Sequence, residues 1–188
     1  MTKKHLSPYG LVGLETISQD PYVETTIPGF RYEDVVTTDL PYAKNHCAAT
    51  AIANLALYFA NIGKSSAVAA TPEATLQSVY ETVGNGPILF FKKRATRYFR
   101  KHDEILSMHA ISRAEISCAI GRGHISVLLL KDGLFHWHWV LAVGERVYAS
   151  GKRYLMVMDG WHRSRPRFFE ITRRGNFAYA LECEMKMF

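Results

Sequence analysis

Three residues that lie far apart in the sequence, Cys47, His138 and Asp159, have the types needed for chemistry by a thiol nucleophile. Cys47 opens a run of alanine and leucine typical of a helix, where unpaired backbone N–H groups and the helix dipole favour a thiolate. Such a nucleophile needs a base within hydrogen-bond reach, and the base needs a third group that orients it. His138 begins the strand-like run H-W-V-L-A-V-G, and Asp159 ends the next strand-like run. His138 is therefore a candidate base and Asp159 a candidate orienting partner.

These residues also allow other interpretations. A cysteine among alanines is usually a small core residue. His136 is a rival base, because period-two alternation places it on the same strand face as His138, and periodicity does not choose between them. The H-x-H pair could also bind a metal with a third ligand, but no second cluster stands at ligand spacing, so we expect no metal and no cofactor. His46 adjoins Cys47 but points about 100° away around a helix, which favours a position at the rim of a cleft.

Composition indicates one ordinary globular domain of 188 residues, with 48% hydrophobic and 21% charged residues. The first residues lack the apolar run of a secretory signal, and no stretch is as long as a membrane span. The three cysteines are far apart and form no C-x-x-C pair, which is typical of free thiols. We therefore expect a soluble, cytoplasmic protein. The net charge of +6 is too common among soluble proteins to indicate a nucleic-acid partner by itself.

The first two thirds of the chain favour turns and then helices. Closely spaced Pro and Gly predict an extended N-terminal wrap over residues 1–40. Helices are expected over about 46–62, with Asn45 as N-cap, and from the Thr71 cap to about Val83. Two further helical segments are 88–102 and a short helix that opens with the capping box Ser112–Glu115. Residues 41–122 are thus expected to be mainly helical.

From residue 123 onward, strand-like runs alternate with turn residues. The runs are HISVLLL, HWHWVLAVG, RYLMVMDG, RPRFFEIT and AYALECEMKMF. Short connections favour antiparallel pairing. Residues 123–188 are therefore expected to form an antiparallel sheet, which makes the chain a single α+β domain of residues 1–188.

The order of these motifs resembles a known family. A helix-opening cysteine in N-x-C, then H-W-V-L-A-V-G, then D-G-W are similar to the papain-like cysteine peptidases. Within them the resemblance is closest to the bacterial group that contains the bacteriocin-processing peptidases, which cut after double-glycine leaders. It covers about residues 40–165. The resemblance implies a papain-like fold, with a central helix bearing Cys47 packed on the sheet. It also implies a cysteine peptidase that uses Cys47, His138 and Asp159 as a catalytic triad.

Two departures from the family pattern concern the residues around Cys47. The family usually has a glutamine about six residues before the cysteine, which donates to the oxyanion, and this sequence has Pro41 there. Asn45 is the nearest amide that could replace it, together with the backbone N–H of Cys47. Its alternative role is the helix N-cap. The second departure is Ala48-Ala49, where many members have glycine and proline, and it bears on substrate entry.

The two tryptophans beside the expected base and acid are candidates for the cleft. Trp139 follows His138 directly. Trp161 follows Asp159 by two positions and could shield the His–Asp pair from water, although a plain core aromatic is an equal alternative.

The basic segment F-F-K-K-R-A-T-R-Y-F-R-K-H places Phe91, Ala95 and Phe99 at helical spacing, with the cations mostly on other faces. A solvated amphipathic helix is the default. The sharper alternatives are a site for an acidic peptide or a phosphate-bearing partner, and an interfacial helix on anionic lipid. The expected substrate is thus a peptide or an amide, with acidic character as one option. No base-reading motif indicates specific nucleic-acid binding. An acyltransferase or amidase, and an inactive papain-like binding module, remain alternatives to the hydrolase.

Overall fold

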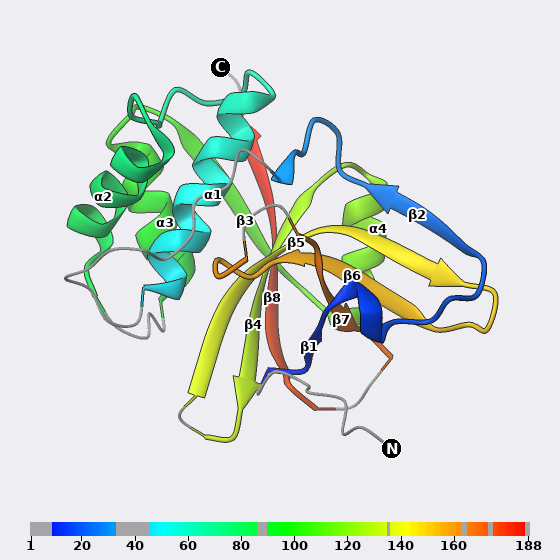
Figure 1. The fold of residues 1–188 in the computed structure, drawn as a ribbon. Coiled ribbons are helices and arrows are strands. Elements are labelled where there is room, and N and C mark those ends of the chain that lie inside the picture. The colour runs from blue at the N-terminus through cyan, green and yellow to red at the C-terminus, as the bar shows by residue number, and fades with distance from the viewer. Residues whose placement is uncertain are drawn as a thin grey trace.

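The computed structural model describes residues 9–32, 46–85, 90–134, 136–162, 165–172 and 175–186, and these form helices and one antiparallel sheet (Figure 1). The helices are α1 (Cys47–Asn61), α2 (Pro72–Val83), α3 (Phe91–Arg100) and α4 (Ile116–Gly121). The strands are β1 (Leu11–Val12), β2 (Tyr22–Thr26), β3 (Ile105–Ile111), β4 (Ile125–Asp132), β5 (His136–Tyr148), β6 (Arg153–Met158), β7 (Arg167–Glu170) and β8 (Phe177–Lys186). The expected α+β class is confirmed. None of the described helices has the length and apolar character needed to cross a bilayer.

Strand β5 is the long central element of the sheet, whose order is β1-β7-β6-β5-β4-β8-β3 with β2 paired to β5 outside this path. β4 pairs with β5 over His136–Ala142, whereas β6 pairs with it only over Leu141–Val147. β2 pairs with the last residues of β5, Gly144–Tyr148. Among the described pairings, the beginning of β5 therefore has a strand on one side only.

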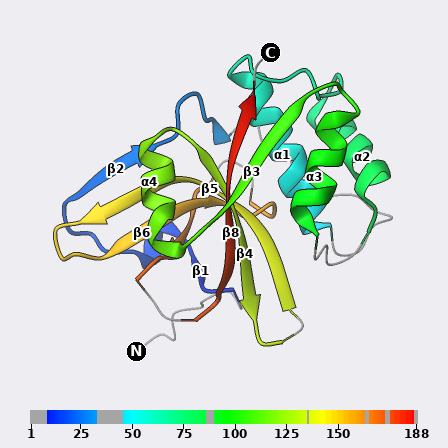
Figure 2. The same cartoon turned by 180° about the vertical axis from the view of Figure 1, so that it is seen from behind.

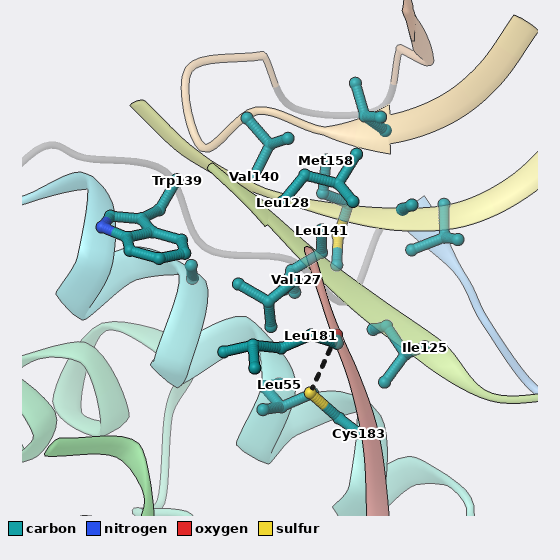
Figure 3. Packing of buried hydrophobic residues seen from close by; sticks show 14 of the residues in the cluster. Leu55, Ile125, Val127, Leu128, Trp139, Val140, Leu141, Met158, Leu181 and Cys183 are labelled. Atoms are coloured by element: carbon teal, nitrogen blue, oxygen red, sulfur yellow. Dashed lines mark hydrogen bonds between the residues drawn. The ribbon is translucent and has the colours of Figure 1, made fainter. Parts of the chain in front are cut away.

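Helices cover both faces of the sheet. α1, α2 and α3 gather on one side, and α4 packs on the other (Figures 1 and 2). α1 is rich in alanine and leucine and is buried on nearly all sides, which lets it lie in the centre of the domain. Leu55 of α1 lies against Leu181 and Cys183 of β8, with Val127 of β4 beside them (Figure 3). This packing holds the middle of α1 against β4 and β8.

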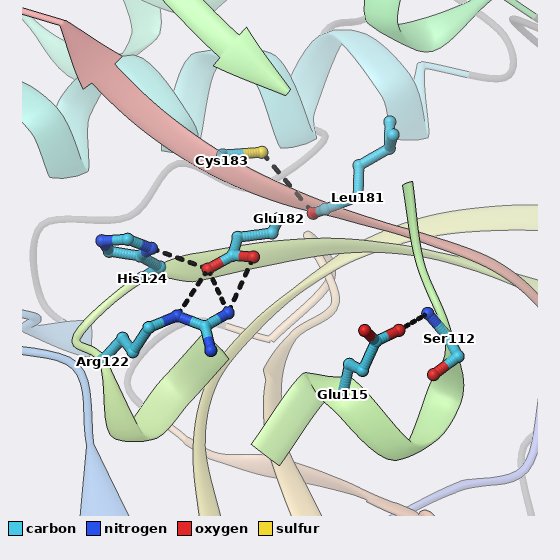
Figure 4. Close-up of polar contacts among 7 residues, drawn as sticks. All are labelled: Ser112, Glu115, Arg122, His124, Leu181, Glu182 and Cys183. Carbon is cyan, nitrogen blue, oxygen red and sulfur yellow. Dashed lines mark hydrogen bonds and ion pairs between the residues drawn. The ribbon is translucent and has the colours of Figure 1, made fainter. Parts of the chain in front are cut away.

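Polar contacts on the α4 face join the end of that helix to β8. Arg122, at the C-terminal end of α4, lies 2.7 Å from the Glu182 carboxylate of β8, and His124 lies 2.7 Å from the same oxygen (Figure 4). Burial raises the pKa of Glu182, but its hydrogen bonds from Arg122 and His124 outweigh burial and lower that pKa below the ordinary value. The predicted capping box is confirmed, because Ser112 N–H donates to Glu115 Oε2 over 2.7 Å.

The predicted helices agree with the structure, with two corrections. The helix over about 46–62 is α1, but its N-cap is His46, so Asn45 as N-cap is wrong. The Thr71 cap is confirmed, since its hydroxyl accepts from Ala74 N–H. The expectation of a mainly helical segment over 41–122 omits β3, which pairs with β8 at the edge of the sheet. Because β3 is partly exposed and pairs with residues far away in sequence, local pattern gives little sign of it.

Candidate active site

Cys47 is the first residue of α1 and is half-buried. Burial raises the pKa of the Cys47 thiol above its ordinary value, although backbone N–H groups of Trp139, Ala48 and Cys47 itself act in the opposite direction. The expectation of a resting thiolate is therefore wrong for this structure, because desolvation outweighs the helix start. The effect of the Trp139 N–H on the Cys47 pKa, together with the packing of α1 on β5, places the sulfur near the backbone of β5.

His138 precedes Trp139 on β5 and is 1% exposed. Its Nε2 atom lies 2.9 Å from the backbone oxygen of Asp159. Because a carbonyl oxygen only accepts hydrogen bonds, Nε2 must carry the proton, which leaves the lone pair of the neutral ring on Nδ1. Burial lowers the pKa of His138 to about 4, against the opposing effects of the Asp159 charge and carbonyl. At neutral pH the imidazole is neutral, as a general base must be.

Asp159 follows β6 and meets His138 through its backbone carbonyl rather than through its carboxylate. The carboxylate is tied to its own turn: Oδ1 accepts from the backbone N–H groups of Trp161 and His162, each over 3.0 Å, and Oδ2 lies 2.7 Å from His162 Nδ1. Gly160 makes this turn possible because its φ is 73°. The side chain of Asp159 thus holds the turn that presents the carbonyl to His138.

Two aromatic rings enclose His138. Trp161 stacks on the imidazole, with ring centroids 3.7 Å apart and an interplanar angle of 8°. Tyr9 lies beside both rings, 5.0 Å from His138 and 5.9 Å from Trp161. Burial and then the charge of Cys47 raise the pKa of Tyr9. Trp161 is 44% exposed, so it shields the histidine as expected and is not a core aromatic.

The other residues expected at the site differ in exposure and in their contacts. His136 is exposed at the start of β5, where it pairs with Asp132 of β4. His46, at the N-cap, has a buried Nδ1 without a hydrogen-bond partner among the described residues. The Trp139 ring is buried against Phe91 of α3, at a centroid distance of 4.5 Å. Asn45 and Pro41 lie outside the described residues.

Sequence reasoning missed two members of the cluster, Tyr9 and His162. His162 had a local signal, because an aspartate often accepts from the backbone two and three residues later, and D-G-W-H places a histidine there. Tyr9 had none, because its neighbours come from the other end of the chain. The structure thus brings His138 and Asp159 together from β5 and the end of β6. Cys47, at the start of α1, lies near Trp139, the residue that follows His138.

Comparison with known proteins gives no further assignment, since no protein-family model and no curated protein matches this sequence. Within the described ranges no group of three or more His, Cys, Asp or Glu residues could hold a metal ion. The chemistry of the site is therefore argued from its own geometry.

Proposed function

We propose that this protein is a papain-like thiol hydrolase that cleaves a peptide or amide bond, with Cys47 as nucleophile and His138 as general base. One observation carries the proposal. Cys47 begins a helix that packs on β5, and the backbone N–H of Trp139 lies near enough to its sulfur to lower the thiol pKa; Trp139 directly follows the buried His138, whose Nε2 donates to a carbonyl. A thiol and a buried neutral imidazole therefore both lie near the beginning of β5, which supports a thiol–imidazole pair.

The reaction starts from the neutral pair. As the Cys47 sulfur bonds to the substrate carbonyl carbon, its proton moves to Nδ1 of His138, and the negative charge passes to the carbonyl oxygen. The unpaired N–H groups of the first turn of α1 stabilise that oxyanion. The amine leaves with the proton from His138. Water then attacks the thioester, gives a proton to His138, and the C–S bond breaks to release the acid and the thiol.

The imidazolium that forms during attack is stabilised by groups already in place. The carbonyl of Asp159 accepts its Nε2–H, and the Asp159 charge favours the protonated ring, as the direction of its effect on the His138 pKa indicates. The stacked Trp161 excludes water from one face of the ring, which strengthens these interactions. Asp159 thus acts as a positioning residue.

A burst experiment with p-nitrophenyl acetate tests the proposal. We expect a rapid release of p-nitrophenolate stoichiometric with protein, and an acetyl group on Cys47 by peptide mapping. Cys47→Ala should lose the burst, whereas Cys118→Ala should keep it, because Cys118 is an exposed thiol outside the cluster. A burst that survives Cys47→Ala overturns the nucleophile, and no burst from the wild type favours the binding-module alternative. Analysis of the products then separates hydrolysis, which gives free acetate, from acyl transfer, which gives the acetylated form of an added amine.

A further inference from the structure

A groove of about 670 Å³ lies between α3 and the sheet, and it reaches the residue that contacts the nucleophile. Trp139 of β5, together with Tyr179 and Leu181 of β8, lines the sheet side. Trp139 and Tyr179 both pair with Leu129 of β4, so their side chains share one face of the sheet. Trp139 directly follows His138 on β5, so the groove begins at the strand that carries the proposed base.

The mouth of the groove exposes aromatic surface. Phe90 is 69% exposed and Tyr179 is 40% exposed, and Phe91 and Trp139 pack together beneath them. Apolar side chains that remain exposed and line a concavity are typical of binding sites. The groove is therefore suited to a large apolar group.

The α3 side of the groove is positively charged. Lys92, Lys93, Arg97 and Arg100 line it, and its lining contains no acidic residue. None of the four forms an ion pair with a described residue, in contrast to Arg122 and Arg146, which are paired with glutamates. Lys93 and Arg100 are seven positions apart on α3, so the cations extend over about 10 Å along the groove. This arrangement fits an occupant with several negative charges spread along its length.

We propose that this groove binds a peptide segment in which carboxylates flank a large apolar side chain, and so selects acidic peptides for cleavage at Cys47. The inference rests on the proposed function, because an acyl-transfer centre beside the groove requires a substrate with a carbonyl group. A fatty acid carries one charge at one end, whereas the cations span the length of about three extended residues. The basic side chains supply the electrostatic attraction, and the aromatic floor supplies the apolar contact.

Binding is measured with the Cys47→Ala variant, so that cleavage plays no part. The probes are fluorescein-labelled Asp-Glu-Phe-Glu-Asp, the same peptide with Ala in place of Phe, its Lys-Lys-Phe-Lys-Lys counterpart, and oligodeoxythymidine. We expect fluorescence anisotropy to show the tightest binding for the acidic Phe peptide, with affinity that falls as salt increases. The double variant Lys93→Glu, Arg97→Glu should weaken this binding by about tenfold or more.

A matched control reverses the same number of charges elsewhere. Lys64→Glu, Lys152→Glu changes two exposed lysines outside the groove and should leave the affinity nearly unchanged. Phe90→Ala should reduce the preference for Phe over Ala in the peptide. Equal loss in both double variants, or tighter binding of oligodeoxythymidine, overturns the peptide groove. A burst from wild-type protein without groove binding refutes only this inference. Groove binding without a burst refutes the hydrolase, and with it cleavage at Cys47, but keeps the groove as a binding site for acidic peptides.

Discussion

At the residue scale, the backbone carbonyl of Asp159 contacts His138, and the carboxylate of Asp159 has a different role. An aspartate near a histidine is expected to orient the ring with its carboxylate, but the side chain of Asp159 stabilises the 159–162 turn and its carbonyl contacts Nε2. The sequence could place Asp159 beside His138. It could not reveal which oxygen faces the ring, because that depends on the conformation of the turn at Gly160.

This division predicts a graded response at position 159. Asp159→Asn keeps an oxygen that accepts from Trp161 and His162 N–H, so the carbonyl should stay in place and the acylation rate should fall by less than about tenfold. Asp159→Ala loses the turn and should reduce the rate much more. Pre-steady-state burst rates measure both. Equally severe losses in the two variants would show that the carboxylate itself is required.

The Cys47 thiol should ionise only in alkaline solution. Burial raises its pKa above the ordinary value of 9.0, so its rate of alkylation by iodoacetamide should still be rising at pH 9. Exposed Cys118 provides an internal reference, and buried Cys183 should react only on unfolding. Mass-spectrometric mapping across the pH range measures the three rates together. A plateau of the Cys47 rate at neutral pH would instead indicate a thiolate–imidazolium pair.

At the scale of elements, the sequence predicted the helices whose ends are set by neighbouring residues. The alanine-rich α1, the capped α2 and the capping box before α4 carry their starts and stops in a few adjacent residues. What sequence reasoning missed depends on distant partners: β3 requires β8, and the one-sided pairing of β5 at His138 requires β6 to end at Met158. That strand end leaves the backbone of Trp139 able to contact Cys47.

The Thr71 cap offers a quantitative test of the local signals. Thr71→Ala removes the oxygen that accepts from Ala74 N–H and should lower the free energy of unfolding by about 1 kcal/mol. Thr71→Ser should cost little, because serine caps as well. Urea denaturation of the three proteins measures the difference. A loss in the serine variant as large as in the alanine variant would assign the effect to lost packing of the methyl group.

At the scale of the whole molecule, the site depends on how the helical layer lies on the sheet. Cys47 belongs to the first and His138 to the second, and contacts such as Trp139 with Phe91 hold the two layers together. Burial of the site between them also desolvates both reacting groups, which raises the pKa of Cys47 and lowers that of His138. Formation of the site is therefore linked to the stability of the fold.

Because folding desolvates His138, we expect its protonation to destabilise the folded protein at acidic pH. Its pKa falls from 6.5 in the unfolded chain to about 4 in the folded protein, so between these values the unfolded state binds more protons. The stabilising contribution is complete above pH 6.5 and is lost as the pH falls toward 4, with a slope of up to about 1.4 kcal/mol per pH unit and a total of about 3 kcal/mol. His138→Gln removes the titrating group. The free energy of unfolding of the wild type, minus that of this variant, should therefore decrease as the pH is lowered from 6.5 to 4.

Urea denaturation at several pH values from about 4 to about 8 measures this difference directly. The subtraction removes the contribution of every group that titrates alike in both proteins, including the Glu182 carboxylate, whose lowered pKa acts in the same direction. His136→Gln is the matched control, because His136 is exposed on the same strand, and its difference from the wild type should not vary with pH in this way. Parallel curves for the wild type and His138→Gln would mean that His138 is solvated in the folded protein. Desolvation could then not be what keeps this imidazole neutral beside the thiol.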